Sequence, residues 1–279
     1  MAGNAGNAGN AGNAGGVGAV GSGPSLTPIL PDRVDLPFVT VNDPPGQAIS
    51  SNRVNIAVYP DRRWSAEWRA WNSLSQYTAT GWANIVVQPW NPAGAGTEID
   101  QLVLAARDER ADALGEIVAQ NEEFLGYFMT LLTMTPAGYP NTYRLLNFAS
   151  NVAMFTVLHF KGGSPTTYPA RPRPSHLCPA LLPPVPVPGH PSYPSGHSTE
   201  AHLIALVLGD ILANSVQAGP LTNDLDALAA RIARNREIAG LHYPSDSAAG
   251  AQLAKDILTY MKQTAEYQKV LPDAQSEWP

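Results

Sequence analysis

A serine, a glycine and a histidine stand together directly ahead of an apolar run that predicts a helix. These residues are Ser195, Gly196 and His197. The glycine lets a ligand approach the backbone, and the free N–H groups of a helix start attract anions. The serine supplies a hydroxyl donor, and an imidazole beside a bound anion can pass a proton to or from an oxygen. A serine N-cap followed by an ordinary histidine is the alternative interpretation.

A second group of charged residues ends a later predicted helix. Arg236 lies four residues beyond Ile232, on the face that apolar residues predict to be buried. A buried arginine needs a partner, either a carboxylate or an oxyanion that accepts paired hydrogen bonds. His242 and Asp246 follow, four residues apart. The carboxylate can fix the tautomer of the histidine and leave the other ring nitrogen as a nucleophile or ligand, unless this is a structural histidine at a turn.

Positive charge also accumulates ahead of these two groups. Lys161 is the only lysine before Lys255, so it does not belong to a scatter of surface lysines. Arg171 and Arg173 alternate with prolines in a proline-dense stretch that cannot form a regular helix. We expect these cations to converge with Arg236 around a small, multiply charged oxyanion. Without an anion, each pair of cations at ~4 Å would repel by about 4 kcal/mol at an effective dielectric constant of ~20.

The chain resembles the superfamily of type-2 phosphatidic acid phosphatases and vanadium haloperoxidases. The signature of that superfamily has three parts. They are a lysine, six residues and Arg-Pro; then Pro-Ser-Gly-His; then Ser-Arg, five residues, a histidine, three residues and an aspartate. The second part is intact at residues 194–197. The third part is intact at Arg236, His242 and Asp246, except that Asn235 stands in place of the serine.

The first part of the signature departs from the pattern. Eleven residues separate Lys161 from Arg173, and an insertion within residues 162–170 would explain the difference. Either Arg171 or Arg173 can then be the pocket arginine, and we prefer Arg173 with Arg171 beside it. The resemblance covers about residues 97–261.

The resemblance implies a role for each of these residues. His242 would bind the central atom of the anion, which is the metal in a haloperoxidase. Asp246 would orient His242, and His197 would be the acid–base residue. The equatorial oxygens would be held by three cations, a hydroxyl and a backbone N–H, which belong to Lys161, Arg173 (with Arg171 beside it), Arg236, Ser195 and Gly196.

Two reactions fit such a site. With vanadate as the cofactor, hydrogen peroxide would oxidise a halide at the vanadate bound to His242, assisted by His197. With phosphate, His242 would attack a phosphate monoester, His197 would protonate the leaving oxygen, and water would cleave the phosphohistidine.

His190 favours the first reaction. It lies seven residues before His197 in a stretch, residues 189–197, that resembles one in vanadium bromoperoxidases, where a second histidine faces the halide side of the metal. A loop histidine without a role is the alternative. We therefore predict a vanadium-dependent haloperoxidase that oxidises halide, bromide in particular. The chain length, closer to that of soluble acid phosphatases, favours the alternative of an acid phosphatase. A third hypothesis, a non-catalytic oxyanion-binding protein, would need neither catalytic histidine.

Composition excludes several other classes of protein. The chain of 279 residues has a net charge of −6, which disfavours nucleic acid because neutralising phosphates requires a basic surface. Its best apolar run, residues 201–216, contains Asp210, so we expect no membrane span. The single cysteine, Cys178, excludes an internal disulfide framework. Without a recognisable signal peptide we expect a soluble, cytoplasmic protein, and the sequence leaves open whether it forms a homo-oligomer.

Hydrophobic periodicity predicts an all-α fold with about six or seven helices, a bundle of the kind that the resemblance implies for vanadium haloperoxidases and acid phosphatases. Thr97 is expected to be the N-cap of the first core helix, and a second helix should run from Leu114 to a stop near Pro136. Four more helices are expected at residues 141–160, 195–216, 221–239 and 246–261.

The chain divides into three parts by composition. Residues 1–25 are expected to be a flexible Ala-Gly-Asn-rich tail, and residues 97–279 a helical catalytic core. Residues 26–96 are expected to form an extended segment, with a short strand at 54–59, and a tryptophan-rich helix packed on the core. The tryptophans of that helix recur at helical spacing, so we expect core packing, with a ligand wall as the alternative. Residues 26–279 should form one domain.

Overall fold

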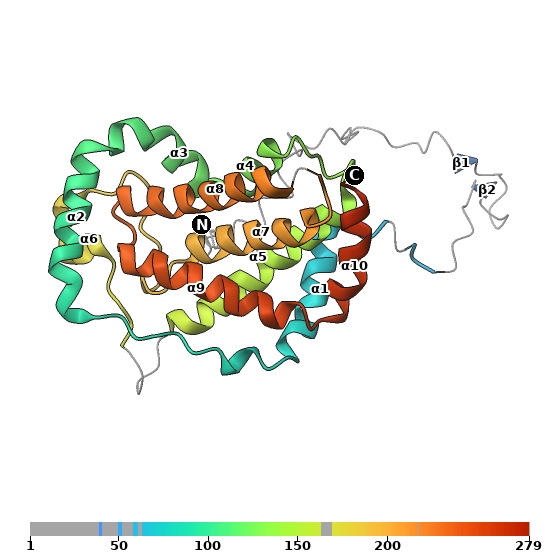
Figure 1. Ribbon diagram of the computed structural model, residues 1–279, viewed down its shortest axis with the longest axis horizontal. Coiled ribbons are helices and arrows are strands. Elements are labelled where there is room, and N and C mark those ends of the chain that lie inside the picture. Colours follow the sequence, from blue (N-terminus) through green and yellow to red (C-terminus); the bar gives the residue numbers. More distant parts are fainter. Residues whose placement is uncertain are drawn as a thin grey trace.

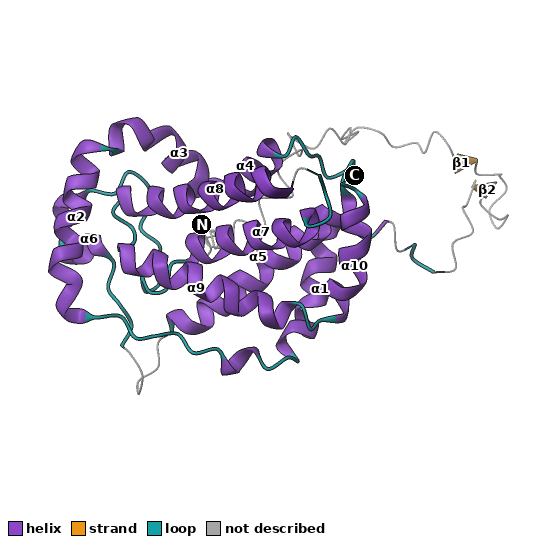
Figure 2. Ribbon diagram, viewed as in Figure 1, coloured by secondary structure: helices purple, strands orange, loops and turns teal. Residues whose placement is uncertain are grey.

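Helices make up most of the described chain. The computed structural model describes residues 39–40, 50–51, 58–60, 63–162, 169–216 and 218–278. Within these residues ten α-helices confirm the predicted all-α class (Figure 2). The two strands there, β1 (Val39–Thr40) and β2 (Ser50–Ser51), pair antiparallel. The predicted tail lies outside the described residues, as does most of the predicted strand at 54–59, of which Val58 and Tyr59 are not in a strand.

Helix α7 (Gly196–Leu212) is the centre of the bundle. It lies between α8 (Ala218–Ile238) and α9 (Pro244–Met261) and packs against α5 (Pro140–Lys161) (Figure 1). Apolar residues occur all round α7, and a helix of that kind is buried on all sides. These four helices agree with the predicted ones to within four residues at either end.

The helices before α5 depart from the prediction. Helix α2 (Ala95–Asp108) begins ahead of Thr97, with Gly94 as its N-cap, so the predicted N-cap at Thr97 is wrong. The reason is an earlier 3-10 turn, Pro92–Gly94, in which the side chain of Asn91 accepts the N–H of Ala93. The second predicted helix is two helices, α3 (Arg110–Glu122) and α4 (Leu125–Leu131), because the backbone becomes extended at Glu123.

Helix α1 (Ala66–Thr78) packs on α5, as expected for the tryptophan-rich helix, but it turns its other face inward. The residues buried in this contact are Ala70, Ser73 and Tyr77. Trp64, Trp68 and Trp71 are 40%, 70% and 48% exposed, so the prediction that they are core residues is wrong. Both faces of the helix carry large or apolar residues at helical spacing, and periodicity alone cannot tell which face is buried.

Two helices were not predicted. Helix α10 (Ala265–Ser276) contains Pro272 and packs against α5 and α7, and the short α6 (Pro174–Leu177) lies inside the proline-dense stretch. Two further 3-10 turns are Trp82–Asn84 and Pro179–Leu181. Among the described residues, every helix is too short or too polar to span a bilayer.

Candidate active site

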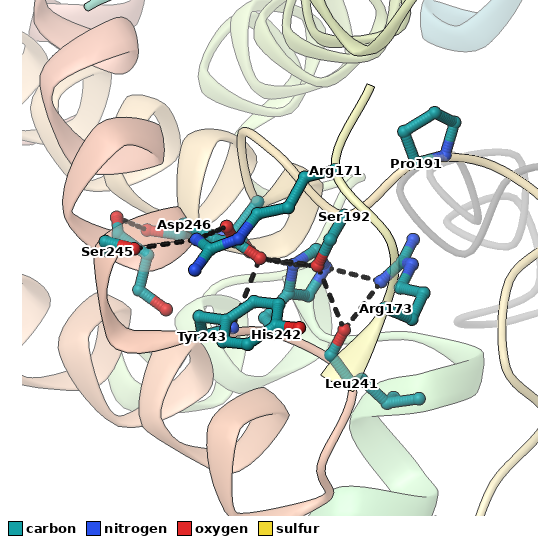
Figure 3. Close-up of polar contacts among 12 residues, drawn as sticks. Arg171, Arg173, Pro191, Ser192, Leu241, His242, Tyr243, Ser245 and Asp246 are labelled. Carbon is teal, nitrogen blue, oxygen red and sulfur yellow. Dashed lines mark hydrogen bonds and ion pairs between the residues drawn. The ribbon is translucent and has the colours of Figure 1, made fainter. Parts of the chain in front are cut away.

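The residues predicted to do chemistry meet at one end of α7, where several helix ends come together. Lys161 is the last residue of α5, Gly196 is the first of α7, and Arg236 lies in the last turn of α8. Asp246 lies in the first turn of α9, and Arg173 is the N-cap of α6. All five residues are buried. Figure 3 shows the polar contacts between the loop before α6 and the start of α9.

Ser195 is the N-cap of α7. Its Oγ accepts a hydrogen bond from the N–H of Ser198 (3.4 Å), and its own N–H donates to the carbonyl oxygen of Asp246 (3.0 Å). The hydroxyl hydrogen of Ser195 remains available as a donor, because a cap uses only a lone pair. Gly250 in α9 allows this close approach, since a Cβ there would lie 2.7 Å from the carbonyl oxygen of Ser195. The tip of α7 is thereby held against the first turn of α9.

A glycine turn between α8 and α9 positions Arg236 and His242. Gly240 has a φ of 75°, a conformation that favours glycine. Its N–H donates to Glu237 (2.7 Å), and the N–H of Leu241 donates to the carbonyl oxygen of Arg236 (3.0 Å). This pair of bonds closes a helix in a Schellman motif. The turn brings the backbone N–H of His242 to 3.4 Å from the same carbonyl oxygen, beside the end of α8.

The ring of His242 is oriented by Asp246. Nδ1 of His242 lies 3.1 Å from Oδ2 of the carboxylate, which also accepts the hydroxyl of Ser192 (2.5 Å) and the N–H of Tyr243 (3.1 Å) (Figure 3). A carboxylate can only accept, so Nδ1 carries the hydrogen and Nε2 is the unprotonated nitrogen. His242 therefore presents a lone pair at Nε2, as a nucleophile or ligand requires.

Arg173 lies at that unprotonated nitrogen. Its Nη1 is 2.9 Å from Nε2 of His242 and donates to the carbonyl oxygen of Leu241 (2.9 Å). Its Nη2 lies 3.0 Å from Nδ1 of His190, and its Nε donates to the carbonyl oxygen of His190 (3.1 Å). Arg173 therefore joins two of the three histidines that the sequence singled out, His190 and His242.

Arg171 points to the opposite side of the same network. Its Nη1 donates to Oδ1 of Asp246 (2.6 Å) and to Oγ of Ser245 (2.7 Å), and its Nη2 donates to Glu98 (2.6 Å). The sequence left open which of the two arginines lies in the pocket. Of the two, Arg173 contacts His242 and Arg171 contacts its carboxylate partner.

Lys161 and Arg236 complete the group of buried cations. Nζ of Lys161 donates to the carbonyl oxygens of Pro191 (2.9 Å) and Ser192 (2.8 Å). Arg236 donates from Nη2 to Oδ1 of Asn121 (3.1 Å). Its Nε and Nη1 are buried and have no hydrogen-bond partner among the residues that the structure describes. Such unpaired donors are costly, and the oxygens of an anion would satisfy them.

His197 lies against the segment that joins α3 to α4. Its Nε2 is 3.3 Å from the carbonyl oxygen of Gln120, and its ring centroid is 5.3 Å from that of Phe124. Burial lowers the pKa of His197 well below its usual 6.5, and positive charge on Arg236 lowers it further. A carbonyl oxygen only accepts, so the neutral ring carries its hydrogen at Nε2 and can accept a proton at Nδ1.

The cations and histidines of the site lie close enough together to shift one another's pKa. Burial is the main cause of each lowered pKa, but the charge of Arg173 also lowers the pKa of five neighbouring groups, which are Lys161, His190, His197, Arg236 and His242. Burial lowers the pKa of Arg173 to about 10 and that of Arg236 to about 9, so both stay protonated at neutral pH.

Carboxylates offset only part of this positive charge. The four cations Lys161, Arg171, Arg173 and Arg236 lie with two carboxylates, Asp246 and Glu98. With its lysine and arginines protonated, the cluster has an excess of two positive charges. A doubly charged oxyanion would balance that excess.

Sequence reasoning missed the supporting residues. Ser192 and Glu98 bind the two ends of the Asp246–Arg171 pair, and no motif marks either of them. Asn235, which replaces the serine of the signature, donates to Glu116 (2.9 Å) and to Oε1 of Gln120 (2.9 Å). It thus ties α8 to α3.

A cavity of about 480 Å³ adjoins the site. Its lining includes Arg171, Arg173, His176 and His190, with Pro172, Pro188 and Pro191 among the wall residues. His190 is half-buried there, and its Nε2 has no partner within the described part of the chain. The larger cavity of about 1170 Å³ lies between α4 and α8 and is lined by none of the predicted site residues.

Comparisons with known proteins do not identify the chain. No known protein-family model matches it, and a search of curated proteins finds no match. The described residues contain no group of three or more histidines, cysteines, aspartates or glutamates that could hold a metal ion. A site with one histidine ligand and an oxyanion does not need such a group.

Proposed function

We propose that this chain is a vanadium-dependent haloperoxidase, which oxidises halide, bromide in particular, with hydrogen peroxide. The observation that carries the proposal is the contact of Arg173 with both His242 (2.9 Å) and His190 (3.0 Å) inside a buried, positively charged cluster. This arrangement joins an unprotonated histidine nitrogen, an oxyanion donor and a second histidine at the adjoining cavity.

The residues present fit vanadate. The two unpaired donors of Arg236, and the excess of two positive charges that the cluster has when Lys161 is protonated, call for an anion with several oxygens. Vanadate would be held by His242 at Nε2, by the cations Lys161, Arg173 and Arg236, and by the hydroxyl of Ser195 and the N–H of Gly196. When bound, it supplies a Lewis-acidic centre that activates hydrogen peroxide toward halide.

The chain's own residues supply the proton transfer. Asp246 holds Nδ1 of His242, so Nε2 stays unprotonated while the ligand is bound. His197 is neutral because burial lowers its pKa, and it can accept a proton at Nδ1 while Nε2 donates to Gln120. In either candidate reaction His197 would exchange a proton with an oxygen of the anion or of its substrate.

The surroundings of His190 favour a small anionic substrate. Burial lowers its pKa to about 4, and the positive charges of Lys161 and Arg173 lower it in the same direction, so the ring is neutral at neutral pH. Its Nε2 has no partner among the described residues, and three of the ten residues that line the cavity are prolines. The cavity of about 480 Å³ has room for halide and peroxide beside His190.

The test is a pair of assays on purified protein. Bromination of a reporter dye with bromide and peroxide should require orthovanadate and should disappear in His242→Ala while the protein stays folded. His202→Ala, a histidine of α7 outside the site, should keep it. Hydrolysis of p-nitrophenyl phosphate that vanadate inhibits would instead show an acid phosphatase. Tight phosphate binding with neither activity would leave a non-catalytic oxyanion-binding protein, and wild-type turnover in His242→Ala would refute the site.

A further inference from the structure

We infer that Arg171 is a positioning residue for the Asp246 carboxylate and not a ligand of the oxyanion. The inference rests on the proposed function insofar as His242 is the residue that binds the oxyanion. Arg171 is fully buried, and its two terminal nitrogens are occupied: Nη1 donates to Asp246 (2.6 Å) and Nη2 to Glu98 (2.6 Å).

Stacking fixes the plane of the guanidinium. Its carbon lies 3.6 Å from the ring centroid of Tyr243 and 4.9 Å from that of Trp90. Planar stacking of this kind is specific to arginine and limits rotation toward other partners. Nε of Arg171 and one N–H of Nη2 have no partner among the described residues, so they are the donors through which Arg171 could still reach an oxyanion.

The carboxylate of Asp246 needs Arg171 because its two oxygens have unequal support. Oδ2 is shared by His242, Ser192 and the N–H of Tyr243, whereas Arg171 is the partner found for Oδ1 within the described chain. Without Arg171, a fully buried carboxylate would hold one unpaired oxygen. It would then rotate toward new donors and release the hydrogen bond that orients His242.

Glu98 anchors Arg171 from the other side. It lies in the first turn of α2, accepts Arg171 with Oε2, and accepts the N–H of Ser245 with Oε1 (2.8 Å). The Glu98–Arg171 pair is neutral, so Arg171 orients Asp246 without adding to the charge excess of the pocket. A continuous chain of contacts, from Glu98 through Arg171 and Asp246 to His242, thus joins α2 to the catalytic histidine.

Two arginine variants separate positioning from ligation. Arg171→Met and Arg173→Met are compared by calorimetric binding of orthovanadate and by the ¹⁵N resonances of His242, which distinguish protonated from unprotonated ring nitrogens. Arg173→Met should lower the affinity by about 100-fold or more, as loss of a charge-assisted contact implies. Arg171→Met should lower it by less than about tenfold but reduce the fraction of the His242 ring with its hydrogen on Nδ1.

Arg171→Lys provides the second measurement if Arg171→Met does not fold. It keeps the charge but cannot span Asp246 and Glu98, so His242 should again lose part of its Nδ1–H population, with little loss of affinity. An affinity loss in either Arg171 variant as large as in Arg173→Met, with an unchanged His242 spectrum, would overturn the inference. Wild-type protein that binds no vanadate would refute the proposed function, while the ring spectra would still decide the role of Arg171.

Discussion

Nε2 of His242 lies 2.9 Å from Nη1 of Arg173, and Nδ1 of the same ring lies 3.1 Å from Asp246. A guanidinium only donates and a carboxylate only accepts, so the two contacts favour the same tautomer from opposite sides. Burial and the charge of Arg173 also lower the pKa of His242 well below 6.5. The ring is therefore held neutral, with its lone pair facing the cation that would share a bound oxyanion.

Because Arg236 has unpaired donors, we predict that the site lowers the stability of the anion-free protein. Arg236→Met removes a buried charge with two unsatisfied nitrogens, so the anion-free protein should gain about 1–3 kcal/mol in free energy of unfolding. Urea unfolding measures this, and orthovanadate should stabilise the wild type but not the variant. Arg231 lies on the same helix as Arg236 and forms an ion pair at the surface with Glu116 of α3. Arg231→Met should therefore change stability by less than about 0.5 kcal/mol. Destabilisation by Arg236→Met would contradict the prediction.

The buried position of Lys161 leads us to predict that the protein takes up a proton when it binds an anion. Burial, followed by the charge of Arg173, lowers its pKa well below the usual 10.5. In the anion-free protein this depressed pKa contributes stability that is present above pH 10.5 and is lost as pH falls through the folded pKa. A bound dianion raises the pKa again, so its affinity should weaken as pH rises above the folded pKa.

Sulfate is the suitable probe for this effect, because it is a tetrahedral dianion that does not titrate in this range. Calorimetry in two buffers of different ionisation enthalpy should show proton uptake on binding, approaching about one proton per sulfate above the folded pKa of Lys161. Lys161→Met should abolish the uptake. Equal uptake in the variant would assign the proton to another group.

The sequence predicts the helices around the site well because their apolar residues follow one period. Helices α8 and α9 each have one clearly buried stripe, and α5 and α7 have apolar residues buried on all sides. The same method placed Trp64, Trp68 and Trp71 in the core, where they are not, because the opposite face of α1 offers equally spaced candidates.

The site could be predicted only as far as its motifs reach. The signature singled out Arg236, His242 and Asp246, and the glycine turn at Gly240 brings the backbone of His242 beside the end of α8. It could not decide between Arg171 and Arg173, which are two residues apart but contact opposite ends of the His242–Asp246 pair. Glu98, the partner that distinguishes Arg171 from Arg173, lies 73 residues before Arg171 in another helix.

Glu200 predicts a pH-dependent stability that does not depend on the oxyanion. It is buried in α7, and burial raises its pKa from 4.5 to about 8. A raised pKa contributes stability that is present below pH 4.5 and is lost as pH rises toward 8, up to about 5 kcal/mol. Glu200→Gln should remove this loss, so the variant should be more stable than the wild type above pH 8. The exposed substitution Asp273→Asn should leave the profile of urea unfolding against pH unchanged; a Glu200→Gln profile parallel to the wild type would refute the assignment.

Gly250 predicts that the tip of α7 tolerates no side chain beneath it. A Cβ at residue 250 would lie 2.7 Å from the carbonyl oxygen of Ser195, 2.9 Å from Cβ of Ser198 and 3.0 Å from Oγ1 of Thr199. Gly250→Ala should therefore destabilise the protein by about 1–3 kcal/mol, even though alanine is the better helix former. It should also weaken orthovanadate binding, because Ser195 and Gly196 would move away from α9.

Gly209 provides the matched control in α7, since a Cβ there meets nothing within 4 Å. Gly209→Ala should stabilise the protein by up to about 1 kcal/mol and leave orthovanadate affinity unchanged. Urea unfolding and calorimetric titration of the two variants separate helix propensity from the contact between α7 and α9. If Gly250→Ala matched Gly209→Ala in both measurements, the tip of α7 would not depend on its contact with α9.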